Sequence, residues 1–142
     1  YTEVTNAIAT RGVSSVGVFG YSYGGDATHD LSRRLDENRA KIGAFTIAYS
    51  AYVDAIARPF WASQTGRPQG AVYHANYYQT RDTPHGGPTD PPGANLSVNV
   101  QTNWDPLVTH AHGLSDPPPD HSIDNNANVM SGLKSLFMLM PY

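Results

Sequence analysis

The sequence predicts an α/β fold in which a mostly parallel sheet of about four strands is flanked by helices. Apolar, β-branched stretches alternate with segments that have helical spacing. Residues 13–20, "VSSVGVFG", are apolar on both faces, as in a strand that helices cover on both sides. The order strand, helix, strand, loop, strand, loop, strand, helix is typical of a parallel sheet.

One helix is predicted before this first strand in the sequence, and another after it. Residues 2–15, "TEVTNAIATRGVSS", predict a helix that ends at Gly12. Residues 24–38 predict an amphipathic helix that packs on the sheet. Its apolar residues recur at helical spacing: Ala27, Leu31 and Leu35.

The second half of the chain supplies the remaining elements. Residues 42–49 predict a buried strand that runs out toward Asp54, and residues 70–80 an aromatic-rich strand. Residues 95–102 alternate apolar and polar positions, which predicts a fourth strand. Residues 122–140 predict a terminal helix. Glycine and proline mark the long loops between these elements.

Composition narrows the class of protein. The 142 residues suit a single domain over residues 1–142, and no internal repeat is present. The net charge is −3 without a basic run, so nucleic-acid binding has no electrostatic support. The chain has no cysteine, which excludes disulfides and thiolate metal sites. No apolar run has the length of a membrane span.

The sequence begins with Tyr1 rather than methionine and has no positively charged leader. We infer that preceding residues have been removed, either by processing or because the chain was cut from a longer one. We therefore expect a secreted or extracellular protein.

The pattern G-x-S-x-G occurs at Gly20-Tyr21-Ser22-Tyr23-Gly24, between an apolar strand and a helical segment. A tight strand-to-helix turn strains its central residue and lifts a serine hydroxyl clear of the sheet. Ser22 is thus a candidate nucleophile, and the Tyr23 amide, at a helix N-terminus, a candidate oxyanion donor. The alternative is a glycine-rich turn that only lets the helix pack closely on its strand.

A catalytic serine needs a base and an acid that orients the base. Asp54 follows the second predicted strand and Asp82 follows the third. The carboxyl ends of parallel strands lie at one edge of the sheet, where ligands bind. Either aspartate fits the acid, although a solvated loop carboxylate explains Asp82 equally well.

Three histidines precede the last helix: His110, His112 and His121. We favour His121 as the base because it lies directly before the helix. The H-x-H spacing of His110 and His112 could ligate zinc, but no third ligand is evident. His29, on a predicted helix, and His74, in a predicted strand, are interpreted as structural residues.

Several segments resemble the lipase and esterase branch of the α/β-hydrolase superfamily. "VFGYSYGGDATHDL" is similar to the nucleophile elbow and its helix, and "IAYSAYVDAI" to the sixth strand followed by the acid. "HANYYQ" resembles the seventh strand, and "HSIDNNANV" the histidine loop that enters the last helix. The elbow is the most specific of these motifs.

The resemblance implies a serine carboxylic-ester hydrolase that works through an acyl-enzyme. Ser22 would be the nucleophile, His121 the base and Asp54 the acid, with one oxyanion donor at the Tyr23 amide. Tyr21 would contact a small-molecule or lipid-like ester. No metal or organic cofactor is implied.

The chain resembles only the carboxyl-terminal portion of that fold, so the elbow strand is expected at an exposed sheet edge. Such an edge is usually covered, here by a second copy of the chain or by the first helix. The loop that supplies a second oxyanion amide in the family has no counterpart. Loss of one such donor typically lowers turnover by about 10²–10³-fold.

Two other functions fit the sequence. A weakly active or inactive hydrolase-like module could bind a partner or glycan within a larger exported protein. Its contact surface would be aromatic: Phe60, Trp61, Tyr77, Tyr78 and Trp104. Peptidase or thioesterase chemistry would use the same triad on another leaving group.

Overall fold

The computed structural model describes residues 1–56, 66–88, 93–110 and 121–140. Within them, one all-parallel sheet has the strand order β1-β2-β3-β4. The strands are β1 (Ser15–Tyr21), β2 (Thr46–Val53), β3 (Ala71–Tyr78) and β4 (Leu96–Asn99). The helices are α1 (Thr2–Arg11), α2 (Tyr23–Glu37), α3 (Arg39–Ile42), α4 (Val100–Asn103) and α5 (Ala127–Met138), with a 3-10 turn, η2 (Ile123–Asn125). The predicted α/β class is confirmed.

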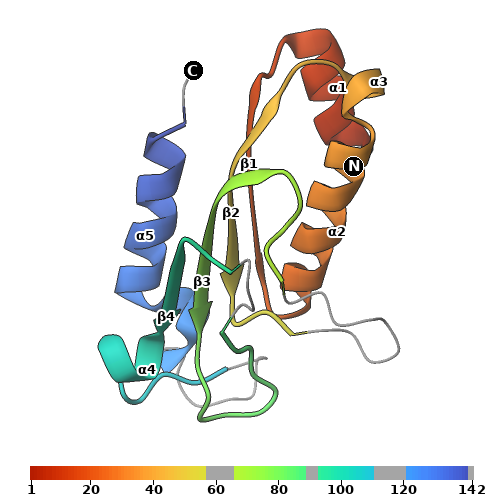
Figure 1. The fold of residues 1–142 in the computed structure, drawn as a ribbon. Helices are drawn as coiled ribbons and strands as arrows, with labels where there is room; N and C mark the ends of the chain where they lie inside the picture. The colour runs from red at the N-terminus through yellow and green to blue at the C-terminus, as the bar shows by residue number, and fades with distance from the viewer. Residues whose placement is uncertain (57–65, 89–92, 111–120, 141–142) are drawn as a thin grey trace.

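Helices cover both faces of the sheet. Figure 1 shows α1, α2 and α3 on one face and α5 on the other, with the carboxyl ends of all strands at one end of the molecule. On the α5 side the core joins Val53 and Tyr77 to Val129 and Leu133. On the other side it joins the sheet to α1 and α2 through Ile8, Val16, Val18, Leu35 and Ile47. No described helix has both the length and the apolar character needed to cross a membrane.

The bounds of two strands differ from the prediction. The second strand was expected at residues 42–49, but β2 is shifted along the chain because Gly43, at φ 123°, ends α3. The fourth was expected over residues 95–102 but is shorter. The Asn99 side chain accepts a hydrogen bond from the Thr102 amide and starts α4 there.

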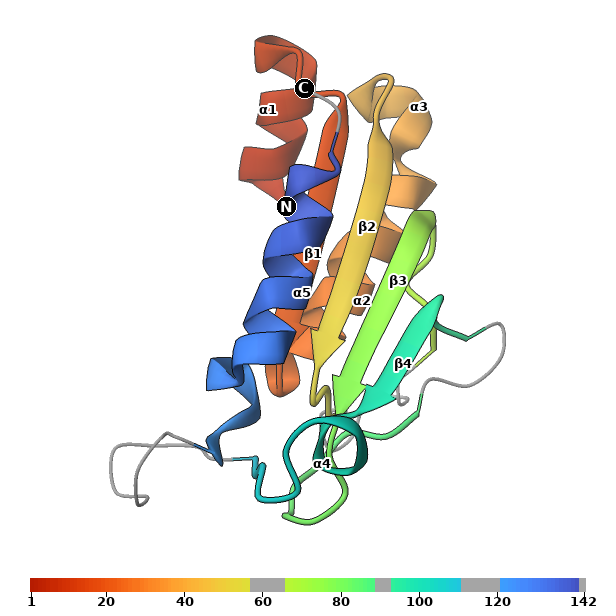
Figure 2. The same cartoon turned by 90° about the vertical axis from the view of Figure 1, so that its left-hand side faces the viewer.

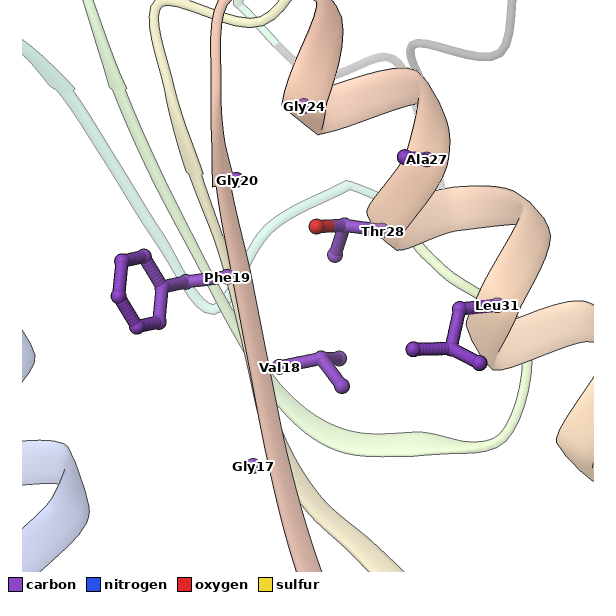
Figure 3. Close-up of a pocket in the computed structure, with 8 residues that line it drawn as sticks. All are labelled: Gly17, Val18, Phe19, Gly20, Gly24, Ala27, Thr28 and Leu31. Carbon is purple, nitrogen blue, oxygen red and sulfur yellow. The ribbon is translucent and has the colours of Figure 1, made fainter. Parts of the chain in front are cut away.

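Helix α2 packs on the sheet through Leu31 and Leu35, as its apolar spacing predicts, and through small and polar residues beside them. The buried residues of α2 are small or polar as well as apolar: Gly25, Thr28, Ser32 and Leu35. A Cβ atom on Gly25 would come within 2.1 Å of the Ala55 Cβ, so helix and sheet approach very closely. Leu31 packs against the edge of the core on this side of the sheet, and together with Ala27 it also lines an open groove beside β1 (Figure 3).

Strand β1 lies at the edge of the sheet, as expected (Figure 2). Near the amino end of β1, Val16 shares a core cluster with Ile8 of helix α1. Beyond this contact, a groove of about 410 Å³ runs between β1 and α2. In Figure 3, Val18 points into the groove and Phe19 to the opposite face, where 50% of Phe19 is exposed.

Candidate active site

Ser22 lies on a strained turn between β1 and α2. Its backbone has φ 55° and ψ −125°, a conformation that L residues rarely adopt. The Ser22 amide donates to Val53 O at 3.0 Å, and the Ser22 carbonyl accepts from the amides of Gly25 and Ile56. These bonds to β2 and its loop hold the turn in place despite the strain.

This turn requires glycine at Gly20 and Gly25, whereas the glycines of the G-x-S-x-G motif are Gly20 and Gly24. A Cβ atom on Gly20 would lie 2.0 Å from Gly24 O, so position 20 admits only glycine. A Cβ atom on Gly24 would meet nothing within 4 Å. The close approach at the other side of Ser22 is made by Gly25, against Ala55.

Asp54 follows β2 directly and is fully buried. Its amide donates to Tyr77 O at 2.7 Å, and its backbone has φ 46°. The side chain of Asp54 therefore turns out of the strand and lies beneath the loop that follows β3. Its Oδ1 accepts a hydrogen bond from the Gly86 amide at 2.5 Å.

His110 connects Asp54 to Ser22. Its Nδ1 lies 2.5 Å from Asp54 Oδ2, and its Nε2 lies 3.2 Å from Ser22 Oγ. All three side chains are nearly inaccessible, at 2% for Ser22, 0% for Asp54 and 4% for His110. This is the order of contacts in a hydroxyl, imidazole and carboxylate triad.

His121, the histidine that the sequence favoured, is not brought to Ser22. Its side chain is 48% exposed, with Nδ1 3.6 Å from Asp105 Oδ2. The segments that carry the two histidines run side by side, since Thr109 and Ser122 form a parallel bridge. Both histidines thus reach the same end of the sheet, and proximity to α5 could not identify which one contacts Asp54. The histidine that contacts both Ser22 and Asp54 is thus His110 and not His121.

Tyr21, predicted to contact substrate, packs on His110. The two ring centroids lie 5.1 Å apart at an interplanar angle of 34°. The Tyr21 hydroxyl is hydrogen-bonded to the Ser122 side chain, and burial, followed by the charges of Asp124 and Asp54, raises the pKa of Tyr21. Tyr21 thereby supports one face of the imidazole.

Tyr23, the predicted oxyanion donor, is the first residue of α2. The first backbone N–H groups of a helix have no acceptor within the helix and carry the positive end of its dipole. The Tyr23 amide is one of these groups and directly follows Ser22. Its side chain is 44% exposed beside the turn.

Asp82, the alternative acid, does not contact a histidine among the described residues. Its carboxylate accepts a hydrogen bond from the Thr83 amide at 3.0 Å. The Asp82 backbone instead bonds to the side chain of Gln79. Asp54 is therefore the aspartate that the fold brings to the imidazole.

His74 and His29 lie on other parts of the fold. His74 is buried in β3 with Nδ1 2.8 Å from Ser50 Oγ, and His29 is partly buried on α2. His112 is outside the described residues. The described residues contain no group of three or more His, Asp or Glu side chains suited to a metal ion.

Sequence reasoning missed Gln79, which contacts Asp54 and is fully buried. Gln79 follows β3 directly, just as Asp54 follows β2 and Ser22 follows β1. Its place after a strand was the available signal, because side chains there converge at the carboxyl edge of the sheet.

Comparisons with protein-family models, curated proteins and solved structures find no match to this chain.

Proposed function

We propose that the protein is a serine carboxylic-ester hydrolase. The observation that carries this proposal is the continuous contact from Ser22 Oγ through the His110 imidazole to the buried Asp54 carboxylate. The strained backbone of Ser22 at a helix N-terminus supports it further.

The first half of the reaction forms an acyl-enzyme. His110 Nε2 takes the proton of Ser22 Oγ as the oxygen attacks the ester carbonyl, and the carbonyl becomes a tetrahedral oxyanion. Asp54 stabilises the imidazolium through Nδ1–H. His110 then gives the proton to the leaving alkoxide, the ester C–O bond breaks, and an alcohol departs.

The second half returns the free enzyme. His110 takes a proton from water as the water oxygen attacks the acyl carbon bonded to Ser22. Collapse of this second tetrahedral intermediate breaks the bond to Ser22 Oγ, which recovers the proton from His110. The carboxylic acid leaves, so the net reaction consumes one ester and one water.

The Tyr23 amide donates to the oxyanion in both intermediates. With this one backbone donor identified among the described residues, turnover should be slow. The exposed Tyr23 ring beside Ser22 favours esters with apolar or aromatic groups, including lipid-like esters. Because Ser22 is only 2% exposed, a small activated ester is the best first substrate.

Hydrolysis of p-nitrophenyl acetate tests the proposal. The Ser22→Ala variant should lose at least about 10³-fold in kcat/KM, since the nucleophile is removed. A folded Ser22→Ala variant that hydrolyses the ester as fast as the unchanged protein would contradict the proposal. Parallel assays with a thioester and a peptide substrate distinguish the leaving groups that share this triad.

The alternative, a module that binds through aromatic residues, has mixed support from the described residues. Tyr77 is 1% exposed in the core on the α5 side, whereas Trp104 is 41% exposed. Phe60 and Trp61 lie outside the described residues. A folded protein whose Ser22 does not react would favour the module that binds without turnover.

A further inference from the structure

We propose that Gln79 is a positioning residue that holds the Asp54 carboxylate against His110. This inference rests on the proposed hydrolase function and adds a residue that acts through Asp54. The Gln79 side chain lies between that carboxylate and the loop after β3, fully buried.

Gln79 supplies half of the donors to the carboxylate. Its Nε2 donates to Asp54 Oδ2 at 2.8 Å, and its backbone amide lies 3.4 Å from Oδ1. The Gly86 amide and His110 Nδ1, each at 2.5 Å, complete the set. A carboxylate has about four acceptor positions, so these contacts fill all of them without water.

The orientation of the Gln79 amide is fixed by the backbone around it. Its Oε1 accepts from the amides of Arg81 and Asp82, each at 2.8 Å. Its Nε2 donates a second hydrogen bond to Asp82 O at 2.9 Å. A flipped amide would place N–H groups against those two backbone donors, so the NH₂ group must face Asp54.

This arrangement has a direct consequence for the triad. A buried carboxylate without donors is costly, and it would rotate or accept a proton rather than hold the imidazole. With Gln79 in place, Oδ2 is directed at His110 Nδ1. The tautomer that leaves Nε2 free to accept the Ser22 proton is thereby favoured.

The test compares Gln79→Met with Gln101→Met. Gln101 also joins loops at this end of the sheet, since its Oε1 accepts from the Thr80 amide and its Nε2 donates to Val108 O, each at 3.0 Å. It makes no described contact with Asp54. Gln79→Met should lower kcat on p-nitrophenyl acetate by about 10–100-fold with KM nearly unchanged.

A proton NMR signal reports on the positioning directly. The hydrogen-bonded Nδ1 proton of His110 should be visible in the unchanged protein and in Gln101→Met, and lost or broadened in Gln79→Met. If Gln79→Met keeps this signal and keeps its kcat, the inference is wrong. If the signal behaves as expected but no protein hydrolyses ester, the hydrolase proposal fails while the positioning role stands.

The Gln79→Glu variant separates donation from packing. It keeps the size of the side chain and the acceptor for Arg81 and Asp82, but it sets a second carboxylate against Asp54. A positioning role predicts that Gln79→Glu is at least as impaired as Gln79→Met. If Gln79→Glu keeps both the kcat and the His110 Nδ1 proton signal of the unchanged protein, donation by the Gln79 Nε2 group is not needed, and that result would overturn the inference.

Discussion

His74 is a second buried histidine, but its contacts differ from those of His110. It is 0% exposed, packs edge-on against Tyr52, and pairs with the hydroxyl of Ser50 rather than with a carboxylate. Burial, with smaller effects of the Arg67 and His29 charges, lowers the pKa of His74 from 6.5 to about 4. The imidazole is thus held neutral, and stability must depend on pH.

We expect the free energy of unfolding to fall as pH decreases from about 6.5 to about 4. In this window the unfolded chain binds a proton at His74 and the folded chain does not. The loss from this residue is at most about 3 kcal/mol and levels off below pH 4. Urea unfolding across this range measures it.

The matched variant is His74→Asn, which can still bond to Ser50 but does not titrate. Its unfolding free energy should depend less on pH between about 6.5 and 4 than that of the unchanged protein. Equal slopes for the two proteins would show that His74 does not hold this pH dependence.

Among the secondary-structure elements, the turn from β1 to α2 sets the position of Ser22. The turn is fixed to β2 by the bonds of Ser22 with Val53 and Ile56. A parallel strand pair and the helix after it therefore bring Ser22 and Asp54 to adjacent strand ends. The closeness of β1 to α2 at Gly20 is what makes this geometry possible.

Substitutions at the two motif glycines should have opposite effects. Gly20→Ala forces a Cβ against the Gly24 carbonyl and should destabilise the protein by about 3 kcal/mol or more. Gly24→Ala meets no neighbour and lies within α2, so it should be neutral or stabilising by up to about 1 kcal/mol. Thermal unfolding of both variants measures the difference, and equal destabilisation would contradict this account of the turn.

The edge strand β1 carries no charged residue and no proline along Ser15–Tyr21. Natural edges are usually protected by such residues, so this strand favours pairing with another copy. Self-association through β1 was expected from the sequence and remains a prediction.

Sedimentation velocity tests this prediction. The unchanged protein should associate as its concentration rises, and Phe19→Lys should weaken association by at least about tenfold, since a charge would enter the edge. Val72→Lys is the control, because Val72 is 63% exposed on β3, which β2 separates from β1. A monomeric protein at all concentrations, or equal effects of the two variants, would contradict the prediction.

Much of the architecture was predictable because local patterns determine it. Gly12, in the left-handed conformation, ends α1 as predicted, and apolar runs, aromatic content and apolar–polar alternation locate the four strands. Strand ends were less certain, since the continuous apolar run around β2 has no period that marks its start.

The candidate site was predictable only where it depends on local structure. Ser22 and Asp54 each follow a strand, which sequence can identify. The choice of His110 over His121 depends on a pairing between distant segments at Thr109 and Ser122, and no local pattern encodes it. Gln79 was missed because its amide acts through tertiary contacts with Asp54.

The proposed triad of Ser22, His110 and Asp54 is tested most directly by labelling the folded protein with a fluorophosphonate and mapping the adduct by mass spectrometry. We expect modification of Ser22, its loss in His110→Ala, and its retention in His121→Ala, because His110 contacts both Ser22 Oγ and Asp54 while His121 lies beside Asp105. A folded protein without an adduct at Ser22, or labelling that depends on His121 and not on His110, would contradict the proposed Ser22–His110–Asp54 triad.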